Sequence, residues 1–319
     1  MGPARRAHTP DRSAERQPTD MTGPRRSALT AVAVLAGAAA VVGGWTLAAP
    51  PDTTPPVPAA ATASHALPQV TERLFRWTEV DYRSTEAQRR YAVACMARHG
   101  FRYEPPAPPL PGTGGDQRPQ PFGQESAAPP AETPPPAEKP PAPGSAETGK
   151  AYGLALFGDQ KKRVTAKGTR GMKVSRPGDG CLAEGETKVL GDGRMRWLQV
   201  RIMLFEAQEQ ARADLEKDPE FRALNGRWRA CMDEAGFAGK TDPARLLGAL
   251  RTEAARHADA SLTADLRCKE STGYLPTAYA RLAAVQQRWL DGHPDVDRDW
   301  KALLRRQDEA TRDVPVPKA

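Results

Sequence analysis

Two stretches, YAVACMARHGF at residues 91–101 and RWRACMDEAGF at residues 227–237, share one pattern. Each contains Cys-Met, three variable residues and Gly-Phe, so that Cys95 matches Cys231. Apolar residues at helical spacing precede both cysteines, and glycine commonly stands just after a helix C-terminus. The pattern therefore predicts two helices that end alike, where the cysteine faces a partner, the glycine turns the chain and the phenylalanine returns to the core.

The four cysteines predict two disulfides if the chain is exported. Cys231 and Cys268 lie 37 residues apart, whereas Cys95 and Cys181 lie 86 apart. Removing the 45 residues of a Pro-rich stretch, 105–149, reduces the second spacing to 41. The spacing favours Cys95–Cys181 and Cys231–Cys268, as in an internal duplication with an insertion in the first copy. Pairing like with like, Cys95 with Cys231 and Cys181 with Cys268, is the alternative.

Residues 27–49 contain no charged side chain. As a helix with a rise of ~1.5 Å per residue they span about 35 Å, which is enough to cross a bilayer. Two arginines immediately before them favour a cytoplasmic N-terminal region, 1–26, and an exported C-terminal part. A signal peptide has the same basic and then apolar pattern up to its cleavage site. Residues 27–49 can therefore be a retained anchor or a cleaved leader. Met1 and Met21 are alternative starts.

The composition changes several times along the chain. Fifteen of the 32 prolines lie between Pro105 and Pro143, which indicates a disordered spacer with polyproline II character. The predicted organisation is a basic N-terminal region 1–26, a transmembrane or signal helix 27–49, a Pro/Ala-rich linker 50–66, a first helical segment 67–104, a Pro-rich disordered insertion 105–149, a main helical part 150–313 and a tail 314–319.

Helical patterns dominate the part after the linker, and the predicted fold class is all-α, stapled by disulfides. Thr85 with Gln88 is a candidate capping box, and Asp218-Pro219 and Asp242-Pro243 are helix starts. The glycine-rich stretch before Cys181 is expected to be a turn-rich loop.

Candidate chemical sites are few. Cys95 and His99 lie one helical turn apart, as two metal ligands can, but the second stretch has Ala235 where the first has His99. Cys231 with His257 could in principle form a Cys–His hydrolase site, although an even set of four cysteines favours structural bridges. We therefore expect no catalytic, cofactor-binding or metal-binding residues.

Two further features bear on partners. The net charge of +7 falls to about +4 after residue 26, and Lys and Arg then alternate with Asp and Glu. Nucleic-acid-binding proteins cluster their basic residues on one face, so we expect no nucleic-acid partner. Trp197 and Trp228 stand at helical spacing and are expected in the core, with a ligand cleft as the alternative.

Four stretches resemble a group of uncharacterised exported proteins of filamentous actinobacteria: YGLALFG (152–158), GCLAEGETKVLG (180–191), RWRACMDEAGF (227–237) and ADLRC (264–268). The resemblance covers most of residues 150–275. It implies a cysteine-linked helical module at the cell envelope and no particular activity. The leader in that group is often a lipoprotein signal, which this chain lacks.

These observations predict an exported cell-envelope protein, either single-pass with its C-terminal part outside the cell or secreted. The expected role is non-enzymatic binding of a cell-wall component, a protein ligand or a membrane partner. The alternatives are an envelope hydrolase of peptidoglycan or peptides with a dispersed motif, and a simple spacer.

Overall fold

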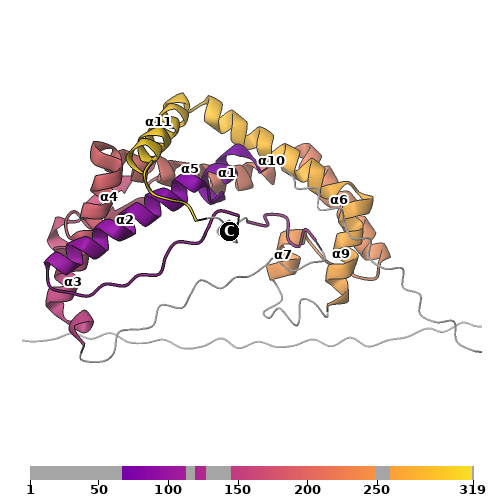
Figure 1. Ribbon diagram of the computed structural model, residues 1–319. Coiled ribbons are helices and arrows are strands. Elements are labelled where there is room, and N and C mark those ends of the chain that lie inside the picture. The colour runs from indigo at the N-terminus through magenta and orange to yellow at the C-terminus, as the bar shows by residue number, and fades with distance from the viewer. Residues whose placement is uncertain (1–66, 113–118, 127–144, 249–258, 318–319) are drawn as a thin grey trace, which may run out of the picture. The chain divides into compact units, whose positions relative to one another are not determined.

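The computed structural model describes residues 67–112, 119–126, 145–248 and 259–317 (Figure 1). The predicted leader, 27–49, and the linker, 50–66, lie outside the described residues. Among the helices that are described, none combines the length and the apolar character needed to cross a membrane.

The described chain is mostly helical, as predicted. Its α-helices are α1 (Gln69–Phe75), α2 (Glu79–Arg98), α3 (Lys150–Phe157), α4 (Cys181–Leu190), α5 (Arg194–Leu215), α6 (Pro219–Glu234), α7 (Pro243–Gly248), α9 (Ala260–Ser271), α10 (Tyr274–Asp291) and α11 (Pro294–Ala310). Three short 3₁₀ turns accompany them: η1 (Ala146–Thr148), η2 (Gln160–Lys162) and η3 (Gly191–Gly193).

The all-α prediction is wrong for one segment. Strands β1 (Val164–Lys167) and β2 (Lys173–Arg176) form an antiparallel hairpin, and its tip and second strand lie in the stretch 168–181 that was expected to be a loop. Its tip is held by a distant residue, because the buried carboxylate of Glu206 on α5 accepts the N–H groups of Arg170 at 3.0 Å and Met172 at 2.9 Å. A Cβ at residue 168 would lie 2.3 Å from Glu206 Oε2, so a side chain there would displace the carboxylate that holds the tip. The hairpin therefore depends on a tertiary contact that local sequence does not reveal.

The two matching stretches end their helices in the same way. Gly100 and Gly236 have φ angles of 78° and 87°, a left-handed conformation that favours glycine. The N–H of the following phenylalanine then bonds back to the methionine carbonyl, at 3.0 Å for Phe101 and 2.8 Å for Phe237. Both phenylalanines pack against a buried cluster. The predicted helix stop is confirmed in both stretches.

Helix starts agree with the sequence in one case and differ in another. The Asp218 side chain accepts the N–H groups of Glu220 and Phe221, both at 3.0 Å, so α6 begins where predicted. Helix α2, in contrast, begins at a capping box formed by Thr78 and Asp81. The predicted box at Thr85 is wrong, because Thr85 lies inside α2, which begins at Glu79.

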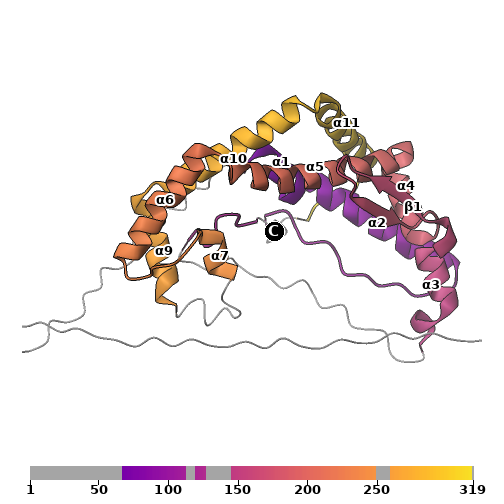
Figure 2. The same cartoon turned by 180° about the vertical axis from the view of Figure 1, so that it is seen from behind.

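Four buried clusters hold the helices together, and the smallest consists of Ala87, Val189 and Leu190. The first lies among α6, α9 and α10, the second among α1, α5, α10 and α11, and the third around Cys95–Cys181 among α2, α3 and α4. Helices α5 and α10 contribute to the first two clusters and lie against each other, while α2 lies along α4 (Figure 2). These contacts place the ends of α5, α6 and α10 together, where a cavity opens.

Candidate functional site

The four cysteines form the two predicted bridges. Cys95 in the last turn of α2 is joined to Cys181 at the start of α4, and Cys231 on α6 is joined to Cys268 on α9. The Cα atoms are 5.5 Å and 5.7 Å apart. The like-with-like alternative is therefore wrong.

The disulfides also bear on the two chemical sites that the sequence suggested for cysteine, a Cys–His nucleophile and a metal site. Cys231 carries no free thiol, so the hypothesis of a Cys–His nucleophile is wrong for this structure, and His257 lies outside the described residues. The ligand atoms of Cys95, His99 and Cys181 lie within 4.8 Å of one another. Both sulfurs are bonded to each other, however, and so do not offer the thiolate that binds a metal.

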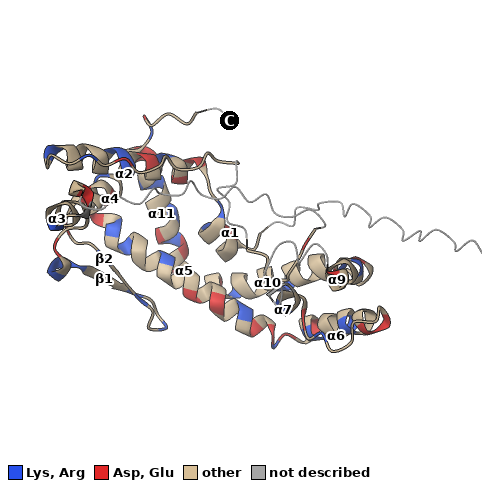
Figure 3. Ribbon diagram, turned by 90° about the horizontal axis from the view of Figure 1, so that it is seen from below, with Lys and Arg blue, Asp and Glu red and all other residues tan. Residues whose placement is uncertain are grey.

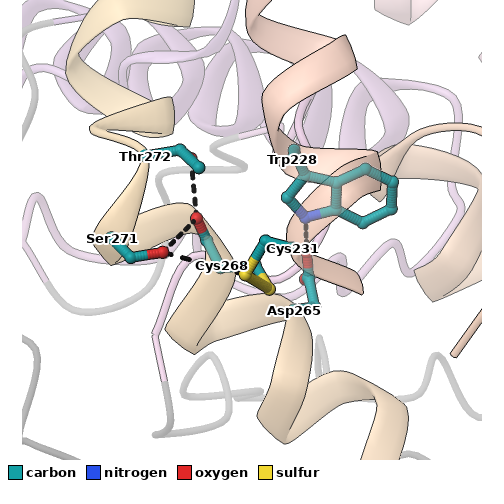
Figure 4. The surroundings of a disulfide bond; sticks show 6 residues. All are labelled: Trp228, Cys231, Asp265, Cys268, Ser271 and Thr272. Carbon is teal, nitrogen blue, oxygen red and sulfur yellow. Dashed lines mark hydrogen bonds between the residues drawn. A yellow bond between two sulfur atoms is a disulfide. The ribbon is translucent and has the colours of Figure 1, made fainter. Parts of the chain in front are cut away.

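A buried ion pair joins Asp265 and Lys269 on α9, the helix that carries Cys268, and Figure 4 shows Asp265 with Trp228 near this second disulfide. Trp228 is fully buried, and its Nε1–H donates to Asp265 Oδ1 at 2.9 Å. The other carboxylate oxygen accepts from Lys269 Nζ at 2.7 Å, and the two charged side chains are 0% and 2% exposed. The prediction that Trp228 belongs to the core is confirmed. Sequence reasoning missed the pair, although Asp and Lys at i and i+4 next to Cys268 are visible in the sequence.

Burial is the main influence on this pair. It raises the pKa of Asp265 and lowers the pKa of Lys269, because each charge has been removed from water. The attraction between the two groups and their short hydrogen bond oppose both shifts. Each partner is therefore what makes burial of the other tolerable.

Part of the Pro-rich insertion packs against this region, and we call residues 119–126 the strap. The backbone carbonyl of Gln124 accepts from Lys269 Nζ at 2.6 Å, and Tyr279 Oη donates to Glu125 Oε1 at 2.5 Å. Phe122 is 4% exposed and meets the ring of Tyr279 edge-on at 5.1 Å. The prediction of disorder is wrong for the strap, because the one aromatic residue of the insertion finds a pocket among other aromatic rings.

The strap forms one wall of a cleft of about 980 Å³. Helices α5, α6 and α10 and the start of α7 form the other walls. Its floor is apolar and consists of buried side chains, among them Phe122, Phe221, Tyr274 and Leu282. Phe205, on the rim, is 41% exposed. This combination of an apolar floor with an exposed aromatic side chain is typical of a ligand site.

Four arginines and three acidic residues line the cleft, and of these Arg245 pairs with Asp242. The guanidinium groups of Arg212, Arg222 and Arg229 line it and make no ion pair or hydrogen bond with any residue in the described part of the chain. Tyr274 donates its hydroxyl to Asn225 Oδ1 at 2.6 Å, and burial raises the pKa of Tyr274, which keeps the phenol protonated. The cleft therefore offers hydrogen-bond donors around apolar surface, an arrangement suited to binding.

The second tryptophan singled out in the sequence lies elsewhere. Trp197 is partly buried and stacks on Trp300 with ring centroids 4.9 Å apart. It packs against the second cluster, as predicted, and also lines a smaller cavity between α2 and α5.

Comparison with known proteins adds no relative: no protein family model matches this chain, and neither does a curated protein or a solved structure.

Proposed function

We propose that this chain is an exported cell-envelope protein, either anchored by residues 27–49 or released by cleavage after them. The uncharged segment behind a basic N-terminal region supports export. The two disulfides support it independently, because such bonds persist in oxidising compartments and are rare in the cytosol. The resemblance to exported actinobacterial proteins agrees with this location.

We further propose that the helical part binds a non-helical polypeptide segment in the cleft, without chemical turnover. The strap carries this proposal, since it is itself a non-helical, proline-containing segment, with a turn at Pro121-Phe122, whose aromatic side chain inserts among α6 and α10. The same helices therefore offer the apolar and polar contacts that a second such segment needs. The three unpaired guanidinium groups favour a ligand segment that carries Asp or Glu beside its apolar anchor.

Export is tested with the full-length chain carrying a C-terminal tag. In intact cells, the tag should be digested by added protease or recovered from the medium, and alkylation should find no free thiol. A protected cytosolic tag on a chain with four reactive thiols would contradict the proposal.

Binding is tested by selecting random peptides displayed on phage against the full chain. We expect the selected peptides to lose about tenfold or more in affinity when Arg222→Glu and Arg229→Glu are combined, because the charge at the rim is reversed. Arg312→Glu is the matched control, since Arg312 is exposed and lies outside the cleft. Peptides that bind both variants equally, or no selected peptide at all, would refute the cleft. Cleavage of a bound peptide would favour a hydrolase instead.

A further inference from the structure

A second cavity of about 280 Å³ opens between α2, β2, α4 and α5. Figure 3 shows arginines along the half of α5 that lies next to α4 and the hairpin. We call this cavity the Arg201 pocket and define it by Ser84, Gln88, Arg176, Arg194, Trp197 and Arg201, which all line it.

The charges of the Arg201 pocket do not cancel. Arg194 Nε donates to Glu186 Oε2 at 2.6 Å, and Arg176 reaches the same carboxylate at 3.5 Å. The other acid that lines the pocket, Asp81, already accepts the N–H and the hydroxyl of Thr78 at the start of α2. Three guanidinium groups thus face two carboxylates, which leaves one positive charge.

That charge belongs to Arg201. Its guanidinium carbon lies 5.6 Å from the ring centroid of Trp197, and the group makes no hydrogen bond or ion pair within the described residues. Burial lowers the pKa of Arg201, an effect that Asp81 opposes and Arg176 strengthens. The contact with the Trp197 ring orients the guanidinium group of Arg201. The free N–H groups of Arg201 have the fork geometry that matches a carboxylate.

A second polar group in the wall also lacks a partner. Ser84 is 3% exposed, and its buried Oγ makes no hydrogen bond. An unpaired hydroxyl and an unpaired guanidinium in the lining of one cavity are unfavourable in a folded protein, because buried polar groups are normally satisfied. A ligand with carboxylate oxygens would supply acceptors for both.

We propose that the Arg201 pocket binds the carboxylate of a small organic molecule about the size of an amino acid. Its volume of about 280 Å³ lies just below the ~300–1,000 Å³ range of drug-sized sites, which fits a smaller ligand. One excess positive charge matches a carboxylate monoanion better than a phosphate dianion. The inference does not rest on the peptide cleft, because the two cavities share no lining residue.

The experiment is calorimetric titration of the full chain with acetate, benzoate, N-acetylalanine, the neutral N-acetylalaninamide and inorganic phosphate, alongside tryptophan fluorescence. We expect a carboxylate to bind and the neutral amide to bind about tenfold or more weakly. Tighter binding of phosphate than of every carboxylate would overturn the carboxylate assignment. Absence of any carboxylate binding below about 10 mM would overturn the site itself.

Variants identify the residues responsible. Arg201→Gln should weaken carboxylate binding about tenfold or more, and Arg201→Lys should weaken it less, since it keeps the charge but loses the fork. Arg312→Gln is the control for a lost surface charge. Ser84→Ala tests the pocket even if the Arg201 variants fail to fold. It should leave the melting temperature of the free protein unchanged or higher and still weaken the ligand several-fold. Equal affinity in Arg201→Gln, Ser84→Ala and the natural protein would refute the proposal.

Discussion

The buried pair of Asp265 and Lys269 gives the sharpest test of the physical reasoning. In Lys269→Met the apolar stem is kept and the ammonium is lost, so Asp265 remains fully buried with only the Trp228 N–H as a strong partner. Removing one member of a buried ion pair typically costs about 3–5 kcal/mol, because the other charge is left uncompensated. We expect a loss of that size, a large share of the ~5–15 kcal/mol total stability of a folded protein.

A matched control exists on the surface. Lys301 and Asp297 have the same N–O distance, 2.7 Å, and the same i,i+4 spacing on a helix, but Lys301 is 59% exposed. Lys301→Met should therefore cost no more than about 1 kcal/mol, since exposed ion pairs contribute little. Asp297 also keeps an ion pair with Arg73 at 2.5 Å in Lys301→Met, so its greater exposure and its second partner both favour a small cost.

The measurement is urea denaturation at pH 7 of both variants, of Asp265→Asn and of the double variant Asp265→Asn/Lys269→Met. The double variant should lose less stability than the two single losses combined, by about 1–3 kcal/mol, because neither lone charge remains. Equal costs for Lys269→Met and Lys301→Met would refute the reasoning. Strict additivity in the double variant would refute it independently.

Stability should also depend on pH with a definite sign. Burial raises the pKa of Asp265 above its ordinary 3.8, and in Lys269→Met the opposing ammonium is gone. A carboxyl whose pKa is higher in the folded than in the unfolded state stabilises the fold at low pH, and this contribution is lost as pH rises through the folded-state pKa. The deficit of Lys269→Met relative to the natural protein should therefore be smaller at pH 4 than at pH 8.

Three further variants probe the strap, a disulfide and the hairpin. Phe122→Ala should cost about 3–5 kcal/mol in urea denaturation, whereas Phe157→Ala, at a side chain 46% exposed, should cost far less; equal losses would mean that the strap is not packed. Replacing Cys231 and Cys268 together by Ser should cost about 4 kcal/mol, judged from the 37-residue separation, and an unchanged melting temperature would contradict this. Burial raises the pKa of Glu206, but hydrogen bonds from the hairpin tip outweigh it and hold that pKa below its ordinary value, so stability is present at neutral pH and lost as pH falls through it. Glu206→Gln should thus cost about 1.5–3 kcal/mol at pH 7 and much less at pH 3, and a loss independent of pH would show that the charge is unimportant.

Structural features that depend on a few adjacent residues could be predicted from the sequence. The helix ends after Cys95 and Cys231 and the start of α6 at Asp218 depend on a few adjacent residues, so their patterns were sufficient. The disulfide pairing followed from spacing alone. Cys181 begins α4, however, whereas Cys268 lies in the last turn of α9, so the two bridges attach to their second helices at opposite ends. The internal duplication stays a prediction.

Features that depend on distant contacts could not be predicted. The hairpin is held by Glu206, more than 30 residues from its tip. The strap lies in a stretch whose composition indicates disorder, and only the presence of Phe122 distinguishes it. The Arg201 pocket requires α2, β2 and α5 to meet, and scattered arginines give no sign of which one will lack a partner. In each case folding joins residues whose local pattern is uninformative.

The buried pair contacts the strap, which also forms one wall of the cleft. Lys269 holds the backbone of Gln124, two residues after Phe122, which forms part of the cleft floor. At a temperature where Lys269→Met is still folded, the strap should be held less firmly and selected peptides should bind the cleft more weakly. Carboxylate affinity at the Arg201 pocket should not change, because that cavity is built from other elements. A parallel loss of both affinities would show that the substitution loosens the whole fold, and that the strap has no separate role in the cleft.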